Sequence, residues 1–165
     1  GNIDGIIEAD ERLGAATLPA EFRESSRKAG GKLLELLADA DDYPFGEVVA
    51  DGIVDDYITA HEASRTDGHY PVVLGLVCEQ AGISRSEAAV VSAYSTVTGL
   101  LGAAQRLGRF GHTDIQGQLS ALSPVVETVC DRYHDADHRE MYSFAPLADV
   151  MGMSHENANR RLFMS

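Results

Sequence analysis

The stretch SRSEAAVVSAYSTVTGLLGAAQRLGRFGHTDIQ, residues 84–116, decides the fold of this chain. Ser84 can cap the N-terminus of a helix, and Glu87, three residues later, can bond back to it in a capping box. Apolar residues then recur every three or four positions, which is the spacing of one helix face. A pair of glycines follows and breaks the helix into a turn. The stretch predicts one long central helix, about residues 84–109, whose apolar face is buried.

The rest of the chain also follows a helical period. Residues 72–77 are apolar enough to form a buried strand, but Pro71 suits the first turn of a helix and favours that interpretation. Pro124 lies inside a helical pattern, so we expect a kink there or a division at Ser123. The further helices are expected near residues 5–13, 17–37 (capped by Thr17 and weakened at Gly30–Gly31), 48–58, 71–81, 113–133 (capped by Thr113 and Gln116), 146–151 and from 154 onward. The prediction is a single, compact, all-α multi-helix domain spanning residues 1–165, wrapped around the long helix.

Length and composition limit the class of protein. A chain of 165 residues with 44% hydrophobic residues can bury one core of its own. It has no apolar run of the roughly 20 residues that cross a bilayer and no signal-peptide pattern, so we expect a cytoplasmic protein without a membrane partner. The net charge of −13 opposes binding to nucleic acid or anionic lipid and favours a basic protein or a cation.

Residues with reactive or metal-binding side chains are few. Cys78 and Cys130 have no CxxC neighbourhood, which favours reduced, buried side chains over a disulfide or a zinc site. The common nucleotide-binding and hydrolase motifs are missing, so we expect no enzyme and no cofactor. If residues 134–138 were helical, His134 and His138 would share a face and could hold Ni²⁺ or Zn²⁺. The simpler interpretation is a pair of exposed side chains with no specific metal.

Three stretches together resemble the urease accessory protein UreF family. The first is FRESSRKAG, residues 22–30, which is similar to that family's arginine–serine–glycine helix. The second is HYPVVLG, residues 69–75, and the third runs from SAY, residues 92–94, to RLGRFGHTDIQ, residues 106–116. The terminal RLFMS, residues 161–165, joins the third. Their order and separation inside a helical chain make the resemblance specific, and it covers nearly all of the sequence.

The chain also departs from the family pattern in two places. The family usually opens with a further helical segment rich in glycine and serine, which nothing in residues 1–7 matches. The chain starts at Gly1 rather than methionine, so a processed or truncated start is allowed. His112 stands where the family tends to have glutamine. We therefore expect the family's fold without its first part.

The resemblance implies a non-enzymatic role in urease maturation. Proteins of this family form homodimers, bind UreD (also called UreH), and through it recruit the GTPase UreG, which carries nickel to apo-urease. We expect this chain to be such a scaffold. The alternatives are a nickel-binding metallochaperone that uses His134 and His138, or a generic helical interaction domain unrelated to urease.

The expected site residues fall into two groups. The exposed turn and the terminal tail supply the expected partner-binding residues. Arg106, Arg109 and Gln116 are expected to face the GTPase or the dimer axis, and Leu162, Phe163 and Ser165 to face UreD. Phe110 and Arg161 are also expected to bind a partner. The family-motif residues are expected to have structural roles: Arg23, Ser26, Gly30, His69, Pro71, Gly75, Tyr94 and Gly111. Taken alone, residues 23–28 favour a solvated basic face over a docking surface.

Overall fold

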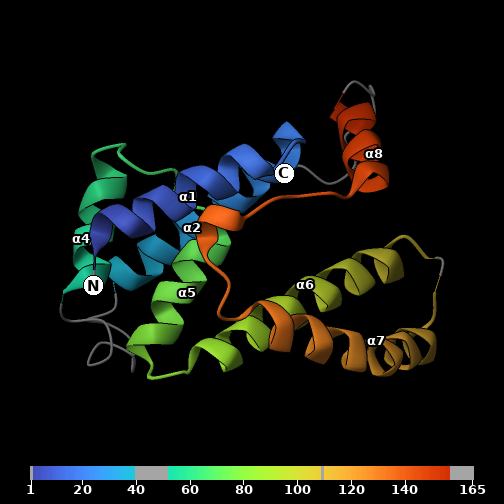
Figure 1. Cartoon of the computed structure of the whole chain (residues 1–165). Helices are drawn as coiled ribbons and strands as arrows, with labels where there is room; N and C mark the ends of the chain where they lie inside the picture. Colours follow the sequence, from blue (N-terminus) through green and yellow to red (C-terminus); the bar gives the residue numbers. More distant parts are fainter. Residues whose placement is uncertain (1, 40–51, 109, 157–165) are drawn as a thin grey trace. The chain divides into compact units, whose positions relative to one another are not determined.

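The computed structural model describes residues 2–39, 52–108 and 110–156. Over these ranges the chain forms α-helices and one short 3₁₀ helix, with no strand (Figure 1). The elements are α1 (Ile3–Ala16), α2 (Ala20–Ala38), α4 (Ile53–Glu62), α5 (Tyr70–Gln80), α6 (Arg85–Arg106), α7 (His112–Tyr133), η2 (His138–Glu140) and α8 (Pro146–Glu156). The predicted all-α fold is confirmed, including the choice of helix over strand for residues 72–77.

The chain forms two compact units. Unit 1 contains residues 1–80 and 137–165, and unit 2 contains residues 81–136. Each unit is described by itself below, and the expectation of one domain spanning the whole chain stays a prediction. None of the helices in the described ranges is both long and apolar enough to cross a membrane.

Unit 1 holds the hydrophobic core. Its buried centre is formed by side chains of α2, α4 and α5, with partly buried residues of α1 packed against it. The central members are Leu34, Val54, Tyr57, Val73 and Leu76. Because these residues recur at helical spacing on three helices, their burial fixes which face of each helix turns inward.

Two details of unit 1 differ from the sequence prediction. Thr17 does not cap α2. It ends α1, where its hydroxyl donates to the carbonyl of Leu13 at 2.8 Å, and Pro19 is the N-cap of α2. The residues expected to form two short C-terminal helices, as far as Glu156, lie in one helix, α8. Residues 48–51 lie outside the described residues, and α4 begins after Gly52, whose φ is +92°.

Unit 2 is a pair of long helices, α6 and α7, that pack along each other. The predicted capping box at Ser84 is confirmed, and α6 runs from there to Arg106. The expected burial of the α6 face is wrong, because α6 contains no buried residue. Across unit 2, the described residues that are buried in a hydrophobic environment are Ile115 and Cys130, both on α7.

The start of α7 also differs from the prediction. The Gly111 N–H donates to the Asp114 carboxylate at 2.9 Å, so the helix begins there and not in a box made by Thr113 and Gln116. The helix continues undivided through Pro124. Both cysteines are free and buried, as predicted.

Candidate functional site

A buried carboxylate lies at the centre of unit 1. Asp10 of α1 is fully buried, and its two oxygens accept four hydrogen bonds from the loop that leads into α5. Oδ1 accepts from the His69 N–H at 2.8 Å. Oδ2 accepts from the Thr66 hydroxyl at 2.7 Å, the Asp67 N–H at 2.9 Å and the Gly68 N–H at 3.0 Å. A negative charge at the first turn of a helix is stabilised by the unpaired N–H groups and the helix dipole.

The polar network extends from this carboxylate to α4. Since Thr66 uses its proton on Asp10, the Tyr57 hydroxyl donates to Thr66 Oγ1 at 3.0 Å. Burial raises the pKa of the Tyr57 phenol, so the phenol stays a hydrogen-bond donor at neutral pH. The network therefore ties α1, α4 and the start of α5 together.

The arginine–serine–glycine motif of α2 lies against the same loop. The Ser26 hydroxyl accepts from the Tyr70 N–H at 3.2 Å. Gly30 is buried so close to the loop that a methyl group there would lie 1.9 Å from the Gly68 carbonyl oxygen. Arg23 donates to the carbonyls of Thr17 and Leu18, 2.6 Å each, and so holds the turn between α1 and α2. Each of the three side chains or positions contacts the backbone of a neighbouring segment, and their expected structural role stays a prediction.

The basic segment of α2 is largely neutralised at its surface. A groove of about 500 Å³ runs beside it, and Arg23, Arg27 and Lys28 line it together with acidic side chains. Arg27 pairs with Asp67 at 3.0 Å, and Lys28 pairs with Glu24 at 3.0 Å. The structure therefore favours a solvated, ion-paired face over a strongly basic docking surface.

His69 packs as a buried side chain. It is 1% exposed, and neither ring nitrogen has a hydrogen-bond partner among the residues that the structure describes. Gly14 leaves room for the ring, since a methyl group there would lie 2.9 Å from Nε2. Pro71 occupies the first turn of α5 as predicted. A close contact at Gly75 is not found, because an added methyl group would meet no atom of the described chain within 4 Å.

Asp10 and Thr66 were not among the residues predicted from the sequence. Asp10 lies four residues after Ile6 and three before Leu13, so it occupies the inward face of α1. A carboxylate on an apolar face was the signal that could have identified it, because such a group must find donors when buried. All four donors are used by the fold, and the cluster is therefore suited to fixing structure and not to binding a substrate.

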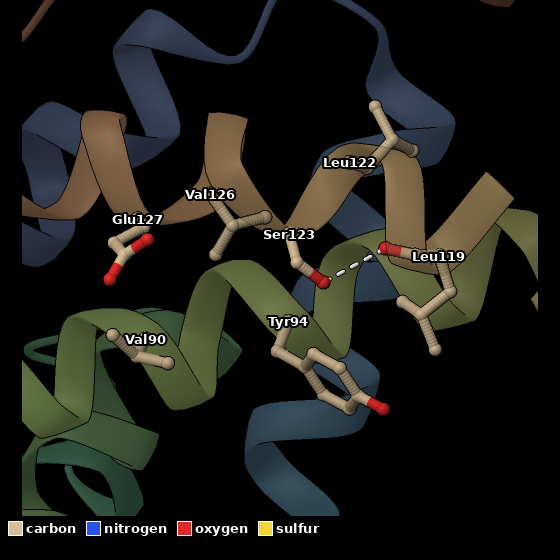
Figure 2. Close-up of a pocket in the computed structure, with 7 residues that line it drawn as sticks. All are labelled: Val90, Tyr94, Leu119, Leu122, Ser123, Val126 and Glu127. Atoms are coloured by element: carbon tan, nitrogen blue, oxygen red, sulfur yellow. Dashed lines mark hydrogen bonds between the residues drawn. The ribbon is translucent and has the colours of Figure 1, made fainter. Parts of the chain in front are cut away.

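Unit 2 carries an apolar groove between its two helices (Figure 2). The α6–α7 groove has a volume of about 310 Å³. It is lined by Val90, Tyr94, Leu119, Leu122, Ser123, Val126 and Glu127. The Ser123 hydroxyl donates to the Leu119 carbonyl at 2.9 Å within α7, so its proton is already used inside the helix. Tyr94, predicted as a family-motif residue, is 47% exposed here.

The turn between α6 and α7 carries the predicted partner-binding residues. Arg106 and Gln116 are exposed, and Phe110 is 49% exposed. Arg106 makes no ion pair with any described residue, and Gly111 serves as the N-cap of α7. Arg109 and the tail residues Arg161, Leu162, Phe163 and Ser165 lie outside the described residues.

The two candidate metal ligands do not share a helix face. His134 ends α7, with Nδ1 donating to the Cys130 carbonyl at 3.0 Å, whereas His138 opens the separate helix η2. His138 instead lies beside Glu8, at 3.6 Å. In the ranges described, no group of three or more histidine, cysteine, aspartate or glutamate side chains could hold a metal ion. The helical spacing assumed for a metal site is therefore wrong.

The fold and these sites define a class of all-α proteins. In unit 1 a buried polar cluster holds the helices together, and in unit 2 a pair of long helices exposes apolar side chains. Comparison with known proteins identifies the family. The UreF family model matches residues 1–123. The urease accessory protein UreF of Yersinia pestis (strain Pestoides F) is 31% identical over 160 residues, which cover 97% of this chain and 67% of the relative.

Two further relatives give the same result. They are urease accessory proteins UreF, one from Yersinia pseudotuberculosis serotype I (strain IP32953) and one from Yersinia enterocolitica serotype O:8 / biotype 1B. Each is 31% identical over 160 residues, which cover 97% of this chain and 67% of the relative. The chain therefore belongs to the UreF family of urease accessory proteins.

Proposed function

We propose that this chain is a non-enzymatic, dimeric scaffold in urease maturation that works in the cytoplasm. It docks UreD (UreH) and the GTPase UreG, and through them it supports nickel transfer to apo-urease, with nickel as the cargo. The observation that supports the proposal is the match along 160 residues to relatives that are named urease accessory proteins. Neither nucleic acid nor a membrane is a partner in this proposal.

The two units support a scaffold in different ways. Asp10 uses its acceptors within the fold, so this buried carboxylate is not free to act as a general base. Unit 2 exposes Arg106 and Phe110 on one turn, and arginine and aromatic side chains are frequent anchors in protein interfaces. Both features fit a protein that positions others and performs no bond-making.

Co-expression with UreD and UreG counterparts tests the function. We expect one assembly that co-elutes in size exclusion and activates urease in a reconstituted system. Elution of this chain apart from both partners, together with full urease activation in its absence, would contradict the proposal. A second readout is turnover of small metabolites by the purified chain, which the scaffold role predicts to be nil.

Charge reversal at the turn tests the partner surface. Arg106→Glu should weaken GTPase binding by about 2 kcal/mol or more if Arg106 is a buried anchor of the complex. Arg132→Glu is the matched control, because it makes the same charge change on the exposed end of α7, where Arg132 lies over the Tyr133 ring at 5.2 Å. Equal binding by both variants would remove Arg106 from the interface.

A further inference from the structure

His69 is a buried titratable side chain that the proposed function does not use. It is 1% exposed, and neither of its ring nitrogens makes a hydrogen bond to a described residue. Buried polar atoms in native proteins nearly always have a partner, so an exception needs an explanation. A protonated ring has two N–H donors and a positive charge, which is costly to bury without a partner of opposite charge.

Asp67 places a carboxylate within reach of this ring. Its Oδ2 lies 3.9 Å from His69 Nε2, about 1 Å beyond the length of a hydrogen bond. Its Oδ1 pairs at 3.0 Å with Nη2 of Arg27 on α2. The Asp67 carboxylate therefore lies between a buried ring on one side and an exposed guanidinium group on the other.

The backbone of this loop is held in place, whereas the Asp67 side chain can turn. The N–H groups of residues 67–69 donate to the Asp10 carboxylate at 2.8 to 3.0 Å. The side chains of Asp67 and Arg27 are both half-exposed, and an ion pair of this kind contributes little to stability. A rotation of the Asp67 side chain can therefore bring its carboxylate to His69 without disturbing the loop.

Further charged or titratable side chains contact residues 66–69 from three helices: Asp10 of α1, Arg27 of α2, and Tyr57 and His61 of α4. Asp10 already accepts four hydrogen bonds. Burial raises the pKa of the Tyr57 phenol, which stays neutral. His61 donates from Nδ1 to the Thr66 carbonyl at 3.2 Å. Asp67 is therefore the group whose position can respond to the charge of His69.

A buried charge competes strongly for a carboxylate. An imidazolium that is left unpaired inside the protein costs far more free energy than the loss of an exposed ion pair, because water solvates the released Arg27. Histidine side chains in general change their charge between pH 8 and pH 5. Over this range the Asp67 carboxylate should turn from Arg27 to His69.

We propose that Asp67 forms a pH-dependent contact, which pairs with Arg27 when His69 is neutral and with His69 when its ring is protonated. This switch goes beyond the proposed function and does not depend on it. In the acid state Arg27 is released into the groove beside α2, which Arg23 and Lys28 also line, so the groove becomes more positive. The released guanidinium group can then bind an oxyanion from outside the chain.

An NMR titration of the full chain from pH 8 to pH 5 tests the switch. The ring signals of His69 and the side-chain nitrogen signals of Arg27 should change with the same midpoint. Asp67→Asn keeps the backbone N–H of the loop but removes the charge, so Arg27 should no longer respond to His69. Glu24→Gln is the matched control, because it removes the other carboxylate that lines the groove, and it should leave the coupled change intact.

Binding of sulfate at low ionic strength provides the second measurement, because sulfate has the same charge at pH 5 and pH 8. At pH 8, Asp67→Asn should bind sulfate about tenfold more tightly than the wild type, as seen in the Arg27 signals. This is the effect of removing one unit charge about 6 Å from a divalent anion in water. At pH 5 the wild type should approach the affinity of the variant, because its Asp67 charge is then paired with His69.

Far-UV circular dichroism should show the same helix content for all variants. Asp67→Ala removes the same carboxylate and replaces Asp67→Asn if that variant loses helix. An Arg27 signal that does not follow His69, or that follows His61 instead, would overturn the inference. A coupled change that survives the loss of the Asp67 carboxylate, or sulfate binding that is equal in wild type and variant at pH 8, would overturn it as well.

Discussion

Replacing Asp10 with asparagine tests whether one buried carboxylate fixes α1 on the start of α5. Asparagine has the same shape, but its NH₂ group replaces one acceptor oxygen. If the NH₂ faces His69, that backbone N–H is left buried and unpaired, which costs about 2 kcal/mol. The other three bonds change from charged to neutral acceptors and lose roughly 1 kcal/mol each, less any relaxation. The expected destabilisation is about 4 kcal/mol.

This loss is large beside the typical stability of a domain, about 5–15 kcal/mol. Urea unfolding followed by far-UV circular dichroism measures it, and hydrogen exchange of the Gly68 and His69 amides shows whether the loss is local. Glu11→Gln is the control, because it makes the same chemical change at the next, exposed position of α1. If Asp10→Asn lies within 1 kcal/mol of that control, the carboxylate does not hold the loop and the reasoning fails.

Three further predictions concern single features. Gly30→Ala should destabilise the fold by about 1–3 kcal/mol, because its methyl group would overlap a backbone carbonyl. Gly31→Ala should stabilise α2 by up to about 1 kcal/mol, because its methyl group would lie in ordinary contact with His61 Nε2, at 3.8 Å. Thermal unfolding compares the two variants. Hydrogen bonds from its N-cap serine hold the pKa of Glu87 below its usual range. The Glu87 carboxylate therefore binds a proton more weakly in the folded state than in the unfolded chain. Its contribution to the free energy of unfolding is present above about pH 4.3 and is lost as the pH falls through the lowered pKa. An NMR titration of Glu87 at the ordinary value would contradict this. Calorimetry should show the same Ni²⁺ binding for the wild type and for the double variant His134→Ala/His138→Ala. A micromolar Ni²⁺ site that is lost in the variant would support the alternative of a metallochaperone.

The sequence predicted the helices better than it predicted their surroundings. Apolar periodicity and the Ser84–Glu87 capping box are local signals, and both gave α6 correctly. The same periodicity predicted a buried face, which is wrong for α6 in the described structure. Local spacing identifies a side that must be covered, but it does not identify what covers it, because that depends on contacts far along the chain or in another molecule.

The polar cluster around Asp10 also depends on contacts that local sequence patterns do not reveal. The motif residues Ser26, Gly30 and His69 were identified from the sequence, yet Asp10, which binds the loop where these three residues meet, was not. Its four donors lie 56 to 59 residues away along the chain. Only the fold brings them together. The prediction that Thr17 caps α2 was wrong for a related reason, since a threonine between two helices can bond to the end of the first helix as well as to the start of the second.

Unit 1 is assembled from two separate parts of the chain, and this affects how the protein is made. The Glu21 N–H, in the first turn of α2, donates to the carboxylate of Glu156, 135 residues later. Contacts between such distant residues form slowly, whereas those between α6 and α7 are local. During synthesis from the N-terminus, the long-helix pair can therefore form while the ribosome is still adding α8, so its apolar groove is exposed before unit 1 is complete. A nascent chain thus exposes an apolar surface early, and it must be protected in the cell from non-specific association with other proteins.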